Sequence, residues 1–232
     1  MLMRAMARRR CFAVSTARGF TLIELLVAIS LMALMAVMAW SGLDGMTRAQ
    51  AQMRQHSDAV LTLQAGLAQW EADLDALASQ PNTPSLDWDG RALRILRRSA
   101  NSPAEGLRVV AWASRSIDGV GHWLRWQSPP LKTRGQLQAA WDKAALWAQN
   151  PGDDERKGEV RIVPLERWQI FYSRNTSWGN PLSSEGVAAD GKAAAIPSIP
   201  DGVRLMLSLP AGPAISGTLT RDWMRPGLGG GK

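Results

Sequence analysis

The chain has 232 residues, enough for one or two domains. Its 27 lysines and arginines exceed its 20 acids, but five arginines and no acid lie in residues 1–19, so the remainder carries a net charge of only +2. A nucleic-acid-binding domain has its basic surface on the folded part, so this distribution argues against a nucleic-acid partner. The one cysteine, Cys11, also lies in that first segment, which excludes disulfides, cysteine-ligated clusters and a catalytic thiol elsewhere.

The chain has only two histidines, His56 and His122, and neither lies in a recognisable motif. A histidine metal site or a proton relay is therefore difficult to build. No nucleophile elbow, phosphate-binding loop or zinc-protease motif occurs either. These observations predict a protein that is not an enzyme, with no catalytic residues, no metal and no cofactor.

Residues 20–40 form an almost wholly apolar segment without glycine or proline. As a helix this segment spans about 31 Å, close to the thickness of the hydrocarbon core of a bilayer. The arginines that precede it predict that residues 1–19 stay in the cytoplasm and that the rest of the chain crosses the membrane.

Three kinds of N-terminal segment fit this pattern: a secretory signal cut near residue 39, an uncleaved anchor, and a prepilin leader cut before the apolar segment. Gly19 at the boundary and Glu24 inside the apolar segment distinguish between them. An acid within a membrane is costly and normally has a partner and a role. Cleavage between Gly19 and Phe20 creates an α-amino group that the Glu24 of a neighbouring subunit can neutralise, which favours the prepilin leader.

The sequence RGFTLIELLVAI, residues 18–29, resembles the N-terminus of type IV pilins and type II secretion pseudopilins. The resemblance implies that Gly19 precedes the cleaved bond. It also implies that Phe20 is the N-methylated first residue of the mature chain and that Glu24 is the carboxylate used in assembly.

A near-continuous helix is expected over residues 20–79, ended by Pro81. Its second half has apolar residues at helical spacing, and these predict an amphipathic face that packs on a globular head. The members of this stripe are Val60, Leu63, Leu67, Trp70, Leu74 and Leu77. The expected organisation is a cleaved leader (1–19), a membrane-spanning half (20–41), an amphipathic half (42–80), a β-rich head (81–226) and a flexible tail (227–232).

Within the head, apolar residues alternate with polar ones in several short runs, which is typical of strands. Strands are expected at 91–98, 107–114, 122–127, 160–163 and 168–172, with a hairpin of 203–209 and 215–223 around a turn at 210–213. Residues 135–149 have the composition of a helix, and residues 150–158 are expected to form a charged loop. No role follows for this 135–158 insertion.

Three further features are candidate sites. Asp87 and Asp89 resemble the start of a calcium loop, but the remaining ligands are missing, so a surface turn is favoured over a metal site. Arg94, Arg97 and Arg98 are expected to form a solvated strand edge or a partner contact rather than a phosphate-binding groove. His56 is expected to be a solvated helix residue.

Tryptophan is the unusual residue, with eleven copies against three phenylalanines and one tyrosine. Most are expected to lie in the core, and Trp40 is expected at the outer membrane interface. Some of the others could form a partner-binding patch, because tryptophan is enriched in interface hot spots. The candidates for that patch are Trp112, Trp123, Trp126, Trp168 and Trp223.

Residues 38–77 resemble the J family of minor pseudopilins, both in Trp40-Ser-Gly-Leu-Asp44 and in Trp70-Glu-Ala-Asp-Leu74, and residues 158–174 and 199–210 resemble its late strands. The resemblance implies an α+β, type IV pilin-like fold, in which a long N-terminal helix packs on an antiparallel β-sheet head. It implies a structural subunit at the tip of a type II secretion pseudopilus, anchored in the inner membrane by a single pass with its head in the periplasm.

The partners that this resemblance implies are the I and K minor pseudopilins, the major pseudopilin and the prepilin peptidase. Two other functions stay open. One is a minor type IV pilin that primes fibre assembly, and the other is a membrane-tethered periplasmic binding or catalytic domain.

Overall fold

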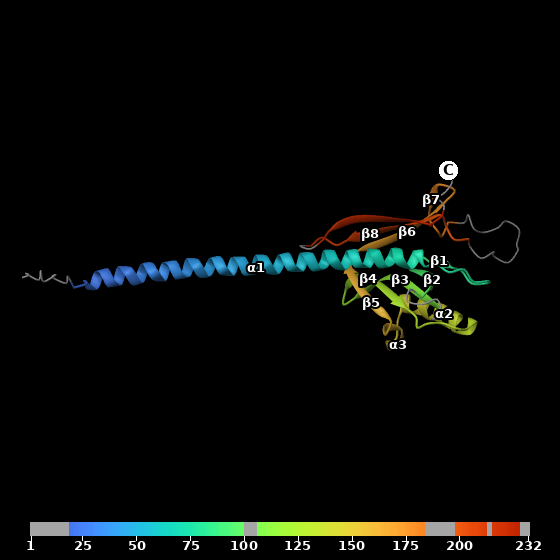
Figure 1. The fold of residues 1–232 in the computed structure, drawn as a ribbon, viewed down its shortest axis with the longest axis horizontal. Helices are drawn as coiled ribbons and strands as arrows, with labels where there is room; N and C mark the ends of the chain where they lie inside the picture. The colour runs from blue at the N-terminus through green and yellow to red at the C-terminus, as the bar shows by residue number, and fades with distance from the viewer. Residues whose placement is uncertain (1–18, 100–105, 184–197, 213–214, 228–232) are drawn as a thin grey trace, which may run out of the picture. The chain divides into compact units, whose positions relative to one another are not determined.

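The computed structural model describes residues 19–99, 106–183, 198–212 and 215–227, so the expected leader and tail fall almost wholly outside the described residues. The chain divides into two compact units, Met1–Ala51 and Gln52–Lys232. Helix α1, Leu22–Asp75, contributes to both. Figure 1 labels the helices and most of the strands along the chain.

Helix α1 ends four residues before the predicted residue 79, and Pro81 is not what ends it. The chain after Asp75 instead pairs with a strand, β2, Ala92–Arg98. Ala78 N donates to Leu96 O at 2.9 Å, and Arg98 N donates to Ala76 O at 2.9 Å. These bonds satisfy backbone groups that another helical turn would otherwise use, so a tertiary contact ends the helix early.

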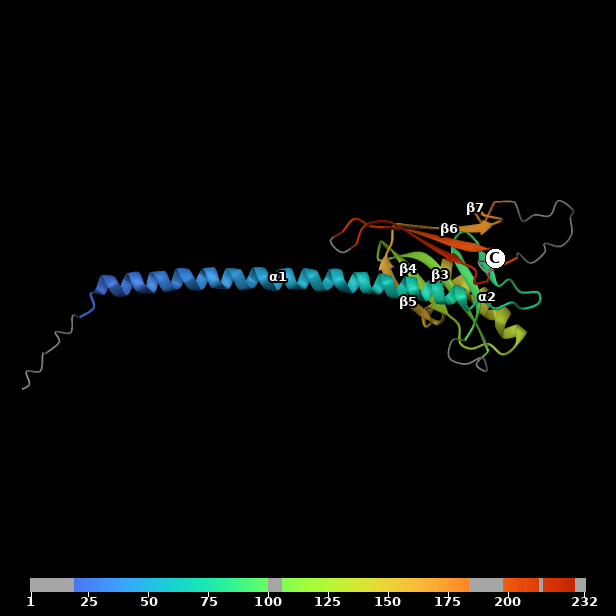
Figure 2. The same ribbon diagram turned by 45° about the horizontal axis from the view of Figure 1, so that its top comes forward.

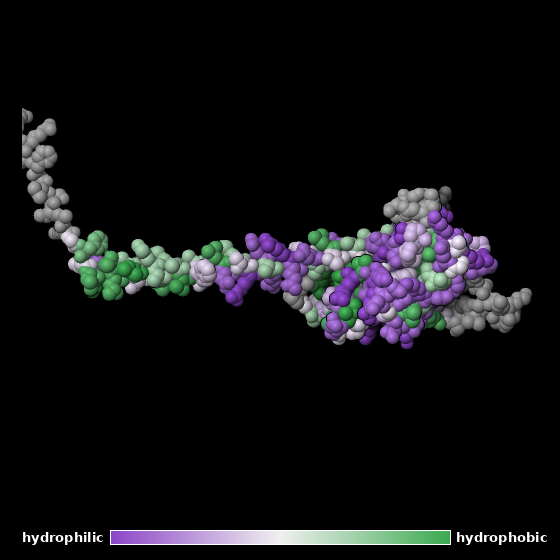
Figure 3. All heavy atoms as spheres, turned by 90° about the horizontal axis from the view of Figure 1, so that it is seen from below, coloured by the Kyte–Doolittle hydropathy of each residue, from purple (hydrophilic) through white to green (hydrophobic). Residues whose placement is uncertain are grey.

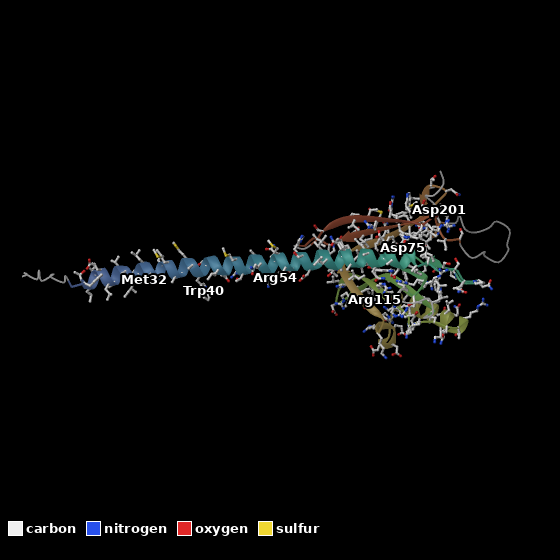
Figure 4. The ribbon with its side chains drawn as sticks, in the orientation of Figure 1. Met32, Trp40, Arg54, Asp75, Arg115 and Asp201 are labelled. Carbon is white, nitrogen blue, oxygen red and sulfur yellow. The ribbon has the colours of Figure 1, made fainter. Side chains whose placement is uncertain are left out.

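In the first unit, the large apolar side chains of α1 are exposed within the chain, for example Ile29 at 58% and Met35 at 70%. This part of the helix is long and apolar enough to cross a membrane. Figure 3 shows hydrophobic side chains over the visible face of this part, followed by hydrophilic ones further along the helix. Figure 4 shows that Met32 and Trp40 point away from the helix axis.

The second unit contains two antiparallel sheets in the described part of the chain. The five-stranded sheet has the order β1-β2-β3-β4-β5, and the four-stranded sheet has the order β7-β6-β8-β9. The remaining strands are β1 Leu86–Trp88, β3 Leu107–Ile117, β4 Val120–Gln127, β5 Glu159–Pro164, β6 Arg167–Arg174, β7 Ser177–Gly179, β8 Gly202–Leu209 and β9 Gly217–Met224.

The strands predicted from the alternation of apolar residues are confirmed, and so is the C-terminal hairpin of β8 and β9. The predicted turn at 210–213 lies partly outside the described residues. Strand β1 was not predicted, and it corrects the expectation of a surface turn at Asp87, because Asp87 and Trp88 pair with Arg94 and Leu93 of β2. The turn begins only at Asp89, whose side chain accepts the N–H groups of Arg91 and Ala92.

The helix residues of the second unit pack between the two sheets (Figures 1 and 2). The predicted apolar stripe is confirmed, because Leu63, Trp70 and Leu74 are buried and Leu67 and Leu77 pack against them. Both sheets contribute to this core, for example Trp112 and Trp123 from the five-stranded sheet and Leu205 from the four-stranded one. The fold is therefore α+β, with the helix buried on two sides.

The insertion covers the other face of the five-stranded sheet. Helix α2, Arg134–Gln149, confirms the predicted helix and begins with a capping box between Thr133 and Gln136. Its apolar side chains form a second core with those of β2, β3 and β4. The expected loop 150–158 contains a short helix, α3, Asp153–Arg156, which corrects that expectation. Helix α2 of the insertion thus covers the second apolar face of the five-stranded sheet, which would otherwise be exposed.

Candidate functional site

Glu24 lies in the first turn of α1, where it forms a capping box with Thr21. Its Oε2 accepts hydrogen bonds from Thr21 N at 3.1 Å and from Thr21 Oγ1 at 2.9 Å, and Thr21 Oγ1 accepts from Glu24 N at 3.4 Å. A carboxylate at a helix N-terminus is stabilised by the unpaired N–H groups there. Thr21 therefore holds the Glu24 carboxylate at the end of the helix.

The three site residues predicted from the sequence lie together at this end of α1. Apart from Gly19 itself and its two neighbours in the chain, no atom of the described residues lies within 4 Å of the position that a Cβ at Gly19 would occupy, and Phe20 is 84% exposed. Both precede the first helical residue, Leu22, and both are exposed, so the bond between them lies outside the helix in accessible chain. Among the described residues, Oε1 of Glu24 accepts no hydrogen bond. The site therefore has an exposed peptide bond next to a carboxylate with a free oxygen.

A second carboxylate of α1, Asp73, is fully buried and was not singled out as a site residue from the sequence. Arg125 donates to it twice, from Nε to Oδ2 and from Nη2 to Oδ1, both at 2.8 Å. Trp112 Nε1 donates to Oδ2 at 2.9 Å, Gln69 Nε2 donates to Oδ1 at 2.9 Å, and Arg97 Nη1 donates to Oδ1. We call Asp73 and these four donors the Asp73 cluster.

The Asp73 cluster joins α1 to three adjacent strands, since Arg97, Trp112 and Arg125 lie on β2, β3 and β4. Charge-assisted hydrogen bonds to a buried carboxylate are about twice as strong as neutral ones. Removing one partner of such a buried pair is costly, because the other charge remains in a dry environment. The cluster is therefore a specific attachment of the helix to the five-stranded sheet.

Two neighbouring carboxylates attach the same part of α1 to the other sheet. Arg221 Nε of β9 donates to Glu71, and Trp223 Nε1 of β9 donates to Asp75 Oδ1 at 2.8 Å. Glu71 and Asp75 are four residues apart and so share one side of the helix, whereas Asp73 lies between them on another side. Figure 4 shows Asp75 near the end of α1.

These contacts correct the expectation that Arg94, Arg97 and Arg98 form a solvated strand edge. Arg97 is only 6% exposed and pairs with Asp73. Arg94 pairs with Asp87 at 2.5 Å, and only Arg98 is exposed. One signal in the sequence could have indicated the Asp73 cluster: Asp73 follows Trp70 by three residues, so it falls within the apolar stripe.

The expected tryptophan patch is also corrected. Trp112, Trp123, Trp126 and Trp223 are buried, and only Trp168 is half-buried. The expectation that most tryptophans lie in the core is confirmed, and seven of the eleven are buried. Four of them pack in pairs, Trp112 on Trp123 with ring centroids 4.5 Å apart and Trp126 on Trp147 with ring centroids 6.4 Å apart. His56 is exposed on α1, as predicted.

A groove of about 840 Å³ lies between α2, α3 and the ends of β4 and β5. Pro129, Pro130 and Ala140 line its apolar part, and Lys143 and Lys157 lie on its polar part. Lys157 pairs with Asp154, which also lines the groove. Within the described part of the chain, no three histidine, cysteine, aspartate or glutamate side chains gather where they could hold a metal ion.

Comparisons with known proteins give one match to the N-terminal segment and one match to nearly the whole chain. Residues 15–40 match the family model of the prokaryotic N-terminal methylation motif, which covers Gly19, Phe20 and Glu24. The chain is 24% identical over 214 residues to type II secretion system protein J of Escherichia coli. That match covers 91% of this chain and 98% of the relative, so the likeness extends through the head. No solved structure matches the chain.

Proposed function

We propose that this chain is a J-type pseudopilin of type II secretion and acts as a minor subunit at the tip of the pseudopilus. In that place it would promote the export of folded proteins across the outer membrane. Its N-terminal motif, its fold and its similarity to protein J support this proposal. The observation that carries the proposal is the match to protein J over nearly the whole of both chains, combined with the methylation motif at the start of α1.

The N-terminal unit supports anchoring in the inner membrane by a single pass. Its apolar side chains have no partner within the described chain, and they surround a helix long enough to cross a bilayer. We infer that the arginine-rich leader stays in the cytoplasm and that the head enters the periplasm. The absence of cysteine beyond Cys11 means that the head folds there without disulfides.

Processing would occur at the bond between Gly19 and Phe20. The bond lies outside the helix, where a peptidase can reach it, and cleavage removes the whole arginine-rich segment. The new α-amino group of Phe20 would be methylated. It would stand one helical turn from Glu24, whose Oε1 can accept a hydrogen bond from the amine of a neighbouring subunit. A charge pair of this kind offsets the cost of placing a carboxylate inside the membrane.

The head is proposed to bind other pseudopilins and to have no catalytic activity. Its polar clusters, at Asp73 and at Glu159, are occupied by internal ion pairs and hydrogen bonds. Such clusters stabilise a fold and leave few groups for acid–base chemistry. We propose the I and K minor pseudopilins as partners in a tip complex, followed by the major pseudopilin.

Complementation tests the function. In a strain that lacks this gene, expression of the chain at native level should restore secretion of the exoproteins, and its affinity purification from detergent-solubilised membranes should recover the I and K pseudopilins. Normal secretion in the deletion strain, together with loss of surface pili, would indicate a minor type IV pilin instead.

Mass spectrometry of the mature protein tests the processing site. The chain should begin with N-methylated Phe20, and Gly19→Trp should leave the leader attached. A mature chain that begins at Trp40 would identify an ordinary secretory signal and contradict the assignment of Gly19, Phe20 and Glu24. A mature chain that retains Met1 would indicate an uncleaved anchor.

A further inference from the structure

We infer that three carboxylates, Glu71, Asp73 and Asp75, fix the axial position of α1 between the two sheets of the head, with Asp73 as the principal positioning residue. We call these three residues the carboxylate clamp. The inference rests on the contacts of the second unit. Only its consequence for secretion rests on the proposed function.

The repeating apolar stripe of the helix selects the axial position less strictly than the carboxylates do. The stripe repeats with a spacing of three and four residues, so a shift by seven places Val60 where Leu67 was, Leu63 where Trp70 was, and Leu67 where Leu74 was. A shift by three residues, about one turn, still brings an apolar residue to three of the six stripe positions. Hydrophobic burial is not directional, so these alternatives differ mainly in packing quality.

The carboxylates select a single position, because no neighbouring turn provides a replacement for Asp73. The residues three and four before it are Trp70 and Gln69, and those three and four after it are Ala76 and Leu77. A shift of one turn, about 5.4 Å, removes the carboxylate from its donors. It leaves the guanidinium groups of Arg97 and Arg125 without an anionic partner in a buried environment.

The clamp acts on both sheets at once. Asp73 contacts β2, β3 and β4, while Glu71 and Asp75 contact Arg221 and Trp223 of β9. All three carboxylates lie within five consecutive residues, so a push along the helix axis strains every one of these bonds together. Packed elements of this kind have discrete positions and do not slide continuously.

This arrangement suits a subunit that transmits an axial push from its helix to its head. If the pseudopilus pushes on exported proteins, the head must not slip along α1. A slipped helix would shorten the subunit by a turn without moving the head. The clamp would therefore set how much of each push reaches the tip.

Two engineered cysteine pairs report the axial position directly. A Cβ at Gly66 lies 2.6 Å from Cγ2 of Ile162 on β5, so Gly66→Cys with Ile162→Cys, the native-position pair, places the two Cβ atoms within the roughly 4.5 Å that a disulfide bridges. Thr62→Cys with Ile162→Cys, the shifted pair, reports the helix pushed forward by one turn. The background is clean, because Cys11 lies in the leader segment and no other cysteine occurs.

The experiment uses the full chain in isolated membranes, with disulfide yield measured after mild oxidation. With the native residues at the clamp, the native-position pair should form its disulfide and the shifted pair should not. Asp73→Asn should lower the yield of the native-position pair at least fivefold and raise that of the shifted pair. Leu63→Ala, which removes apolar contacts from the same core, is the matched control and should keep the yield of the native-position pair.

Unchanged yields in Asp73→Asn, or an equal loss in Leu63→Ala, would overturn the inference. If the head of the Asp73→Asn chain is no longer resistant to protease, the double variant Glu71→Gln with Asp75→Asn provides the test instead. Its contacts are with β9, which is less buried, so the head of this variant should still fold. That variant should lower the yield of the native-position pair about twofold, and an unchanged yield would overturn the inference.

A secretion assay separates this inference from the proposed function. Oxidation should raise the secretion of the Asp73→Asn chain with the native-position pair above that of the reduced chain, because the disulfide replaces the clamp in the fraction of chains that forms it. If the disulfide yields shift as expected but the deletion strain secretes normally, the clamp stands and the proposed function fails. If secretion requires the chain but the yields never shift, the function stands and the clamp fails.

Discussion

The two halves of α1 place a carboxylate in opposite surroundings. Glu24 lies in a segment whose large apolar side chains are exposed, and among the described residues its side chain forms hydrogen bonds only with Thr21. Asp73 lies in a segment packed between two sheets and receives hydrogen bonds from two arginines, a tryptophan and a glutamine.

This difference shows that the role of a charged residue depends on whether its partner lies in the same chain or in another chain. The partners of Asp73 are far apart in sequence but belong to the same chain, so Asp73 stabilises the fold and its removal should destabilise the head. The proposed partner of Glu24 belongs to another chain, so Glu24 should contribute to assembly and little to the stability of the isolated subunit. The predictions below test this contrast.

The largest expected effect is that of Asp73→Ala. Removing one member of a buried charge cluster costs about 3–5 kcal/mol, because the remaining guanidinium groups stay buried without their anion. Urea denaturation of the detergent-solubilised protein, followed by far-ultraviolet circular dichroism, should show this loss. Asp58→Ala, at an exposed position of the same helix, is the control and should change the unfolding midpoint little. Equal effects of the two substitutions would refute the contrast.

Glu24→Ala should leave the stability of the subunit unchanged and weaken its assembly with other pseudopilins. Cleavage, membrane insertion and the urea midpoint should match those of the native chain, since the residue has no partner in the head. Recovery of the chain with the other pseudopilins should fall by about tenfold, because loss of one member of a buried intermolecular charge pair weakens association strongly. Quantitative co-purification measures this fall. Normal recovery at native expression level would remove the role assigned to Glu24.

Trp147→Phe tests how the insertion is attached to the head, and it should lower the stability by an intermediate amount. Trp147 is fully buried, and its Nε1 donates to Glu159 Oε2 at 2.7 Å. Loss of a hydrogen bond to a charged group costs about 2 kcal/mol. Trp141→Phe, on the same helix, is the matched control and should cost less, because its main polar contact is the guanidinium of Arg94 at 5.2 Å from its ring. The urea midpoints of the two variants measure the difference.

The smallest effect is expected for Asp222→Asn, at a more exposed ion pair. The hydrogen bond from Arg204 lowers the pKa of Asp222 below its ordinary value of 3.8. The pair therefore stabilises the fold above about pH 3.8, and this contribution is lost as the pH falls through the lowered pKa.

Asp222→Asn should change the free energy of unfolding by less than about 0.5 kcal/mol at neutral pH, because surface ion pairs contribute little. Thermal unfolding at pH 7 and at pH 3 should show a smaller difference from the native chain at the lower pH. A larger deficit at pH 3 than at pH 7 would contradict this sign.

Local patterns in the sequence determined much of this protein. The long N-terminal helix, its amphipathic stripe, the helix of the insertion and most strands were predicted, because each depends on residues within a few positions of one another. The long match to protein J agrees with the family that these motifs indicated.

Only the tertiary structure decided which charges belong together. Arg97, Trp112 and Arg125 lie 24, 39 and 52 residues from Asp73 in sequence, and the strand order of the sheet brings them to one point on the helix. The same reason explains the early end of α1, the division of the strands into two sheets, and the burial of Arg97. The spacing of apolar residues shows which face of each helix or strand is buried, one element at a time. These features depend instead on how elements that are distant in sequence pack against one another.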